Sequence, residues 1–380
     1  MRIAYVYDAV YPWVKGGAEK RVYEIGKRLA ERGHEVHWFG LKWWNGANTI
    51  EKDGIIIHGI GKWDNLYVNG RRSIGEGIYF GLKTLTSLKG KFDVIDCQNF
   101  PYFSCLSSRI KASLIDSKFF ITWYEIWGDY WYEYLGRKGL FGYLIEKLVS
   151  KIQHYAIAIS EKIKEDLKAL GFPESKILVI PNGVDYCSIK KIDQREEKFD
   201  VIYVGRLISH KRVDLLINAI AEIKKEIPDI KCGIIGDGPE RDNLRKLSLE
   251  KELADNIKFF GFIEDEKDVF SIIKASKVFV LPSVREGFPN TILEANACGL
   301  PVITVRHKKN AGASVIWQGE NGFVVDLDAC AIANKILEII QNTEILEKMR
   351  KSSLEFAKTH DWYRIVDLIE KAYKEVIECR

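Results

Sequence analysis

The sequence predicts an α/β protein with two doubly wound domains, each built on a parallel sheet flanked by helices. In both halves, short apolar runs bounded by turn residues alternate with longer segments of helical period. A chain of 380 residues is also too long for one ordinary core, and its length favours two domains of roughly 150 to 200 residues. We expect the two domains to face each other across a cleft.

The first half carries seven apolar runs of strand length, each next to turn residues. They predict strands at residues 2–8, 35–40, 55–60, 93–97, 119–123, 156–160 and 177–180. Helical periodicity predicts helices at residues 17–32 and 161–170. This alternation of strand and helix predicts a parallel sheet in the N-terminal domain.

The second half repeats the pattern, and its predicted strands are residues 200–205, 232–236, 257–261, 278–282, 302–305 and 322–325. A polar run at residues 190–198, with four basic and three acidic side chains, predicts the linker. We therefore expect an N-terminal domain at residues 1–190 and a C-terminal domain at residues 199–361. Residues 362–377 have helical periodicity and predict a terminal helix.

The composition excludes several classes of protein. A net charge of +4 is small for this length and argues against a nucleic-acid binder. No apolar stretch approaches the roughly 18 residues of a spanning helix. The seven scattered cysteines form no Cys-x-x-Cys pair and favour reduced thiols. Because the N-terminus predicts a buried strand rather than a secretion leader, we expect a cytoplasmic protein, with peripheral contact at the inner membrane face left open.

Two segments of the first half allow two interpretations each. Residues 140–152 place apolar side chains on one helical face beside several cations, which is typical of a core helix and also of an interfacial membrane helix. The aromatic side chains at residues 123–134 could stack on an acceptor saccharide or a polyprenyl-linked sugar, or could form a packed rim.

The run from Glu286 to Glu294 directly follows a predicted strand and leads into a predicted helix. At the carboxyl ends of parallel strands, a helix N-terminus offers backbone N–H groups and a partial positive charge. Pro289 suits the first helical position, and Asn290 and Thr291 suit a cap. Glu294 could then reach a ribose while Glu286 reaches a hexose, so the run predicts a sugar-nucleotide site.

Other loops at predicted strand ends carry glycines or cations. Gly16 and Gly17 precede a helix, where the backbone can approach an anionic ligand. Arg206 and Lys211 lie on one loop and suit a diphosphate. The turn that begins at Gly236 can lie against a nucleotide.

Taken together, these loops resemble the retaining glycosyltransferases of family 4. The resemblance covers nearly the whole chain, and its most specific part is the Glu-x7-Glu element. Its motifs in chain order are Gly16-Gly17, Asn182-Gly183-Val184-Asp185, Gly205-Arg206-Leu207 with Lys211, Gly236-Asp237-Gly238-Pro239, and Glu286 to Glu294. The resemblance implies a GT-B fold of two Rossmann-like domains, with the segment 362–380 packing back on the first.

The resemblance also implies how a nucleoside diphosphate sugar is held, mainly by the C-terminal domain. Arg206 and Lys211 would hold the diphosphate and offset the charge of the leaving group, and Gly16 and Gly17 would close on it. No metal and no cofactor are expected, because the cations do this electrostatic work.

The remaining donor contacts implied by the resemblance surround the sugar and the base. Glu286 would orient the donor sugar, Glu294 would accept hydrogen bonds from the ribose, and Ile263 would lie at the base. The backbone after Glu286 would bind sugar hydroxyls or phosphate, through Gly287, Phe288, Pro289 and Asn290.

One position departs from the family pattern. Members commonly carry a histidine after the strand at residues 119–123, and this chain has Tyr124 there. The predicted catalytic set is therefore Glu286, Lys211, Arg206 and Tyr124. The predicted reaction is transfer of a hexose, with retention, to a glycan or lipid-linked saccharide. The alternatives are a sugar-nucleotide-binding protein with weak or no activity and a sugar-nucleotide epimerase.

Overall fold

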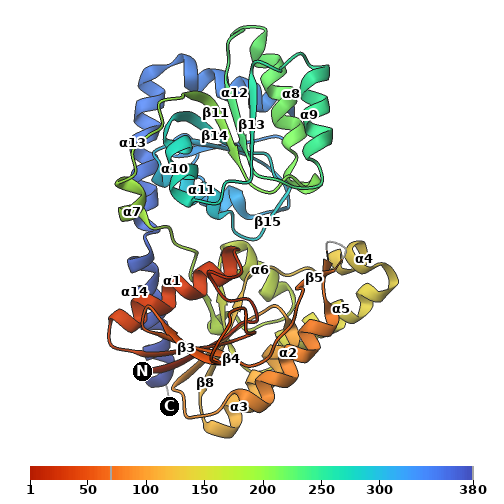
Figure 1. Ribbon diagram of the computed structural model, residues 1–380, viewed down its shortest axis with the longest axis vertical. Coiled ribbons are helices and arrows are strands. Elements are labelled where there is room, and N and C mark those ends of the chain that lie inside the picture. The colour runs from red at the N-terminus through yellow and green to blue at the C-terminus, as the bar shows by residue number, and fades with distance from the viewer. Residues whose placement is uncertain (69–70, 379–380) are drawn as a thin grey trace. The chain divides into compact units, whose positions relative to one another are not determined.

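The computed structural model describes residues 1–68 and 71–378, which form two compact units. The first unit comprises Met1–Asn182 and the C-terminal helix α14 (Trp362–Glu378), and the second comprises Gly183–Asp361 (Figure 1). The boundary therefore falls at Asn182 rather than at residue 190. The predicted linker belongs to the second unit, because Lys274 Nζ donates to the carbonyl oxygen of Ile192 at 2.5 Å. Residues 379–380 of the predicted tail lie outside the described residues.

An eight-stranded sheet forms the centre of the first unit, in the order β10-β9-β8-β7-β1-β2-β4-β3. All pairs are parallel except β3 with β4. The strands are β1 (Arg2–Val6), β2 (Glu35–Gly40), β3 (Thr49–Lys52), β4 (Ile55–Gly59), β7 (Val94–Gln98), β8 (Lys118–Trp123), β9 (Tyr155–Ala158) and β10 (Ile177–Val179). The seven predicted strands are all present.

Three short strands of this unit were not predicted. Edge strand β3 has no buried side chain and hence no apolar run, and β5 (Tyr67–Val68) and β6 (Arg71–Arg72) are too short for a periodic signal. The helices of this unit are α1 (Gly17–Glu31), α2 (Ile74–Ser87), α3 (Tyr102–Ile115), α4 (Tyr130–Leu135), α5 (Gly139–Lys151) and α6 (Glu161–Ala169).

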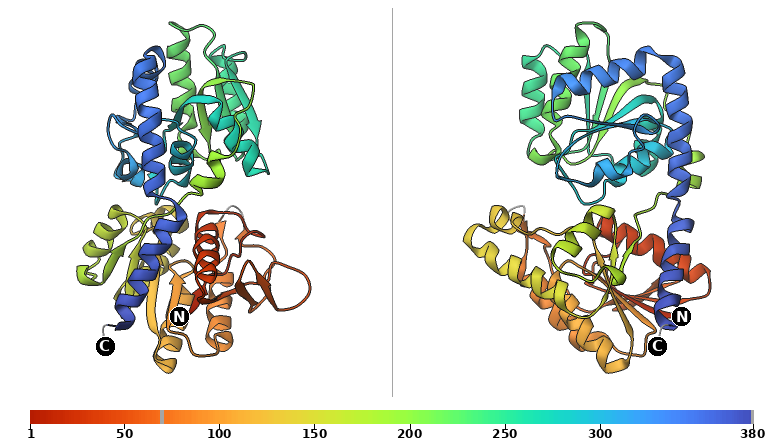
Figure 2. Two further views of the ribbon diagram at one scale, coloured as in Figure 1. Left: turned by 90° about the vertical axis from the view of Figure 1, so that its left-hand side faces the viewer. Right: turned by 180° about the vertical axis from the view of Figure 1, so that it is seen from behind.

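Helices α2, α3 and α5 lie side by side, whereas α1 packs on α14 (Figure 2). The C-terminal helix is anchored to the sheet by Tyr373, whose hydroxyl donates to Asp96 Oδ2 at 2.6 Å. Both side chains are almost completely buried. No helix of the described chain is both long and apolar enough to cross a bilayer.

The second unit contains a six-stranded parallel sheet in the order β13-β12-β11-β14-β16-β18. Its strands are β11 (Phe199–Val204), β12 (Cys232–Ile235), β13 (Ile257–Gly261), β14 (Ser276–Leu281), β16 (Val302–Val305) and β18 (Gly322–Val325), with a separate pair β15 (Arg285–Glu286) and β17 (Lys309–Asn310). Its helices are α7 (Tyr186–Lys190), α8 (Val213–Lys224), α9 (Arg241–Glu250), α10 (Glu266–Lys274), α11 (Asn290–Ala297), α12 (Ala329–Gln341) and α13 (Thr343–Thr359).

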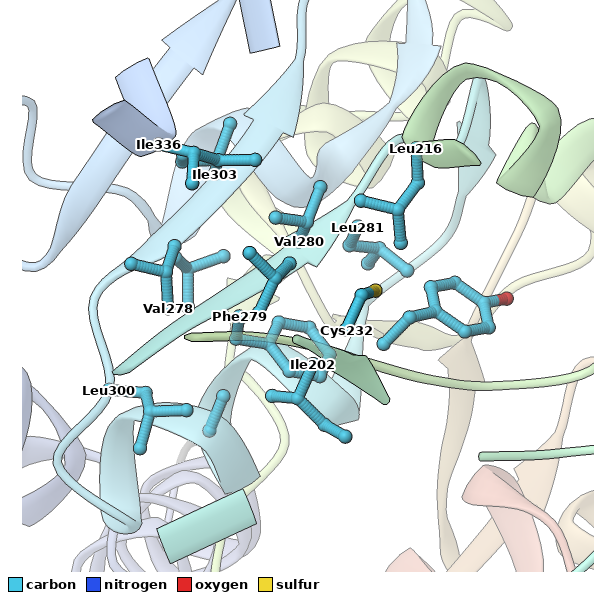
Figure 3. Packing of buried hydrophobic residues seen from close by; sticks show 14 of the residues in the cluster. Ile202, Leu216, Cys232, Val278, Phe279, Val280, Leu281, Leu300, Ile303 and Ile336 are labelled. Atoms are coloured by element: carbon cyan, nitrogen blue, oxygen red, sulfur yellow. The ribbon is translucent and has the colours of Figure 1, made fainter. Parts of the chain in front are cut away.

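Side chains from the central strands and their covering helices form the core of the second unit (Figure 3). Ile202, Phe279 and Ile303 of the sheet are fully buried, as are Leu216 of α8 and Ile336 of α12. Burial on both faces of a parallel sheet explains why these strands are continuously apolar in sequence. The prediction of two doubly wound α/β domains is confirmed.

In each unit the strand order reverses direction at one place. In the first unit β1 has β2 on one side and β7 on the other, and in the second unit β11 has β12 and β14 as neighbours. Loops that follow the two strands at such a switch point diverge and leave a crevice, where ligands of doubly wound folds bind. The predicted donor loops of the second unit follow β11 and β14.

Candidate functional site

The loops after β11 and β14 meet through an ion pair. Lys211 Nζ donates to Glu286 Oε1 at 2.5 Å, and the two side chains are only 18% and 10% exposed. The backbone joins the same loops, because Val284 N donates to the carbonyl oxygen of His210 at 2.9 Å. The structure thus brings two of the predicted site residues together at the switch point of the second unit.

The backbone of Glu286 is held by a residue that the sequence did not single out. Glu286 lies opposite Asn310 in the parallel pair of β15 and β17. The Asn310 side chain is buried, donates to the carbonyl oxygen of Val305 at 2.9 Å and accepts from Gly312 N at 2.8 Å. A lone asparagine in a polar loop carries no local signal of this role.

The loops after β11, β12 and β13 are tied together by their backbones. Gly205 N donates to the carbonyl oxygen of Ile235 at 3.0 Å, and Gly236 N donates to that of Gly261 at 2.8 Å. Gly236 has φ of +132°, and a Cβ atom there would overlap the Gly205 carbonyl group. A glycine at position 236 is therefore required for this close approach.

The other predicted donor residues of the second unit surround these loops. Arg206 is exposed directly after the β11 turn, and its carbonyl oxygen accepts from the Tyr203 hydroxyl at 3.0 Å. Ile263 is half-buried after β13. Thus Arg206 shares the β11 loop with Lys211, while Ile263 lies on a separate loop.

Helix α11 begins one residue later than predicted. Pro289 is the N-cap and has extended backbone angles, so Asn290 is the first helical residue, and the side chain of Pro289 makes no capping hydrogen bond. Gly287 and Phe288 connect β15 to this helix, and Glu294 lies in its second turn. The Glu-x7-Glu run therefore spans a strand end, a short link and a helix start.

The remaining predicted site residues belong to the first unit. Gly16 is the N-cap of α1 and Gly17 its first residue, and both are exposed. Nearby Glu19 is buried, and this burial raises the pKa of its carboxyl to about 7. The glycine pair is thus at the start of a helix, in the loop after β1, as predicted from the local sequence.

Tyr124 directly follows β8. Its hydroxyl donates to Gln98 Oε1 at 2.6 Å, and its backbone N donates to Asn99 Oδ1 at 3.1 Å. Burial raises the pKa of Tyr124 well above its ordinary value, so the phenol stays protonated at neutral pH. The neutral phenol therefore cannot act as a base, and its one hydrogen is donated to Gln98.

A charged cluster that the sequence did not reveal lies at the end of β1. Asp8 is fully buried and forms an ion pair with the Arg72 guanidinium, which also lies 3.7 Å from Glu76 Oε2. Burial of Glu76, reinforced by the charge of Asp8, raises the pKa of Glu76 to about 9. Glu76 thus stays protonated at pH 7 beside the ion pair of Asp8 and Arg72.

The aromatic run after β8 is largely packed. Trp123 and Trp131 are buried, and the Trp127 and Trp131 rings lie 4.5 Å apart. Glu146 of α5 fixes the loop, because it accepts from Trp127 N and Gly128 N, both at 2.8 Å. These contacts support the packed rim for this part of the run, whereas Tyr132 is exposed.

Two doubly wound units with their predicted ligand loops at the strand carboxyl ends are the architecture of the GT-B fold. Sucrose-phosphate synthase from Thermosynechococcus elongatus superposes with a TM-score of 0.81 over 100% of both chains, at 20% identity. HepE from Anabaena, solved in complex with UDP and glucose, superposes with a TM-score of 0.74 over 99% of this chain and 100% of its own, at 19% identity. At these identities the likeness shows the fold.

Sequence comparison identifies the family. The model described as Glycosyltransferase Family 4 matches residues 15–186, and the model described as Glycosyl transferases group 1 matches residues 188–356. The chain belongs to the family 4 glycosyltransferases, as its motifs predicted.

Two relatives show how far sequences diverge within the family. One of the subunits of human phosphatidylinositol N-acetylglucosaminyltransferase is 27% identical over 80% of this chain, and an uncharacterised glycosyltransferase from Methanocaldococcus jannaschii is 29% identical over 57%. The matches span 62% and 57% of the lengths of those two proteins.

Proposed function

We propose that the protein is a retaining glycosyltransferase, which moves a hexose from a nucleoside diphosphate sugar to a hydroxyl group of a saccharide or lipid-linked acceptor. The observation that carries this proposal is the Lys211–Glu286 ion pair at the switch point of the second unit. In this proposal the ammonium group binds phosphate, and the neighbouring carboxylate binds hydroxyl groups of the same nucleotide sugar.

The diphosphate is held by Lys211 and Arg206. An ammonium group has three N–H donors, so Lys211 can keep its bond to Glu286 and still donate to phosphate oxygens. Exposed Arg206 on the same loop adds a guanidinium that suits a diphosphate. Together they stabilise the leaving nucleotide, and in this proposal no divalent ion takes part.

The sugar and ribose are held by the Glu-x7-Glu run. Glu286 accepts hydrogen bonds from the hexose and Glu294 from the ribose, with Gly287 to Asn290 lining the path between them. Helix α11 starts at this point, and its N-terminal end favours a negatively charged group. The UDP in the HepE structure supports a uridine nucleotide as the first donor to test.

The anomeric configuration is retained because the acceptor hydroxyl attacks the sugar from the same face that the nucleoside diphosphate leaves. The leaving phosphate takes the proton of that hydroxyl as the new glycosidic bond forms and the bond to the phosphate breaks. Tyr124 remains protonated and does not act as a base; because its hydrogen is donated to Gln98, its oxygen can only accept a hydrogen bond from a sugar hydroxyl. The protein then contributes positioning and charge stabilisation. NMR of the product tests this step, since an inverted linkage would contradict it.

A sugar-nucleotide-binding protein with weak activity is the second candidate, and Tyr124 at the family's usual histidine position favours it. An epimerase is the third, and would need acid and base groups around the sugar. Labelled nucleotide sugars with and without acceptors separate the three. Transfer requires acceptor-dependent release of nucleotide, an epimerase forms an isomer without acceptor, and a binding protein does neither.

We also propose a peripheral contact with an anionic membrane. Leu140, Phe141, Leu144 and Leu148 of α5 are exposed, so the interpretation of this helix as a core helix is wrong for its outer face. Lys147 and Lys151 on the same helix are exposed too, and apolar side chains flanked by cations favour an interfacial position. Cosedimentation with anionic but not neutral vesicles is the expected result.

A further inference from the structure

The first unit contains an apolar pocket of about 370 Å³ between α2, the start of α3, and helices α4 and α5. Its walls are formed mainly by carbon atoms of large side chains, including Ile74, Ile78, Phe103, Trp131, Phe141 and Ile145. A pocket of this size and lining suits a hydrocarbon ligand.

The apolar walls of this pocket continue onto the surface. Phe141 is 76% exposed, Ile74 54% and Ile78 43%, although α2 and α5 each bury another face. Among the described residues, more than half of the large exposed apolar side chains lie on α2, α3, α4 and α5. Such a concentration marks a surface that binds an apolar partner.

The charged groups of the pocket favour an anionic ligand. Lys138 lines it and is exposed beside exposed Arg137. Of its lining residues, Glu76 is the only acid, and its raised pKa leaves it neutral at pH 7. Arg72, which also lines the pocket, forms its ion pair with Asp8. The lining therefore carries no uncompensated negative charge.

One end of the pocket reaches the switch point of the first unit. Phe100 follows β7 and lines the pocket, and the Arg72 guanidinium lies 5.7 Å from its ring centroid. Asp8, the partner of Arg72, lies just after the end of β1. The pocket thus extends to the sheet edge where doubly wound folds bind ligands.

We propose that this pocket binds a single hydrocarbon chain of an anionic, phosphate-linked lipid, with the phosphate beside Lys138 and Arg137. The chain is that of the acceptor, a statement that rests on the proposed transferase function. The end of the pocket at Arg72 and Phe100 lies next to the carboxyl ends of β1 and β7.

Binding of dodecyl phosphate to the full chain, below its micellar concentration, tests the proposal by calorimetry. We expect saturable binding of one molecule, at least tenfold tighter than butyl phosphate, because the longer chain buries more apolar surface. Dodecyl maltoside, with the same chain and a neutral head, should bind more weakly. Binding of butyl phosphate as tight as that of dodecyl phosphate would overturn the proposal.

Two isoleucines provide matched variants. Ile78→Trp fills the pocket and should weaken the binding of dodecyl phosphate at least tenfold. Ile110 on α3 is 50% exposed and lies outside the lining, so Ile110→Trp should leave this binding unchanged. Ile145→Gln tests the opposite wall if Ile78→Trp fails to fold. Equal affinity of wild type and folded pocket variants would contradict the assignment, as would binding to vesicles without binding to monomeric dodecyl phosphate.

Different results would overturn the pocket assignment and the proposed transferase function. In one outcome, the enzyme transfers sugar to a short-chain soluble acceptor, Ile78→Trp does not change this transfer, and dodecyl phosphate does not bind. This result overturns the pocket assignment and leaves the transferase proposal intact. Dodecyl phosphate binding without transfer to either short-chain or long-chain acceptors overturns the transferase and retains a lipid site.

Discussion

Lys211 and Glu286, 75 residues apart in sequence, are joined by a 2.5 Å bond between Nζ and Oε1. Each belongs to a loop that leaves one of the two strands at the switch point of the second unit. Partial burial of both side chains makes this pair stronger than an exposed one and fixes the direction of the ammonium group. The first prediction follows from this geometry.

Lys211→Ala and Glu286→Gln should each lower kcat/KM for transfer at least about 100-fold, the usual effect of removing one charge-stabilising group. Initial rates with labelled donor measure this, and the thermal unfolding midpoint should change by only a few degrees. Lys225→Ala is the control, because it breaks an exposed 2.5 Å pair with Glu222 outside the site. Unchanged turnover in either site variant would contradict the assigned roles.

Glu76→Gln should stabilise the protein increasingly as the pH rises. The folded state keeps the Glu76 proton up to about pH 9, whereas the unfolded state loses it near 4.5. The unfolded state then binds fewer protons, so this group lowers the free energy of unfolding between those values as pH increases. The variant should gain at least about 1 kcal/mol over wild type between pH 5 and 8 in urea unfolding.

The exposed edge-strand residue Glu51 supplies the control for this titration. Glu51→Gln should follow the wild-type pH dependence across the whole range. A constant difference between Glu76→Gln and wild type would show that Glu76 is ionised in the folded protein.

Glu146→Ala should destabilise the protein by at least about 3 kcal/mol, because several buried or partly buried donors lose their acceptor. Those donors include Trp127 N and Gly128 N at 2.8 Å and the Tyr102 hydroxyl at 2.7 Å. Exposed Glu165→Ala, which breaks only a surface pair, should cost about 0.5 kcal/mol. Similar losses for both variants in denaturant unfolding would disprove the anchoring role.

Gly236→Ala should cost more stability than Gly261→Ala. Both glycines have positive φ, and left-handed backbone costs other residues about 1–2 kcal/mol. A Cβ atom at Gly261 has open space, whereas one at Gly236 meets the Gly205 carbonyl group, so only Gly236→Ala must displace the β11 loop. We expect a further loss of affinity for nucleotide in that variant alone, measured by calorimetry.

The local sequence pattern determined most of the helices and strands of this protein. Strands such as β1 and helices such as α1 were predictable because burial leaves an apolar run or period along the chain. The Glu286 to Glu294 run, with its glycine and proline, was recognisable from consecutive residues alone. Edge strand β3 was missed because it buries nothing that could produce such a period.

Only the tertiary structure decided which distant side chains meet. Nothing near Asp8 in sequence indicates its ion pair with Arg72, and nothing near Glu286 indicates that Asn310 holds its strand. The exposed outer face of α5 was equally hidden, since core and interfacial helices share one periodicity. The amino-acid order specifies the elements through local periodicity and turn chemistry, whereas partners and exposure depend on contacts that form only when the sheets assemble.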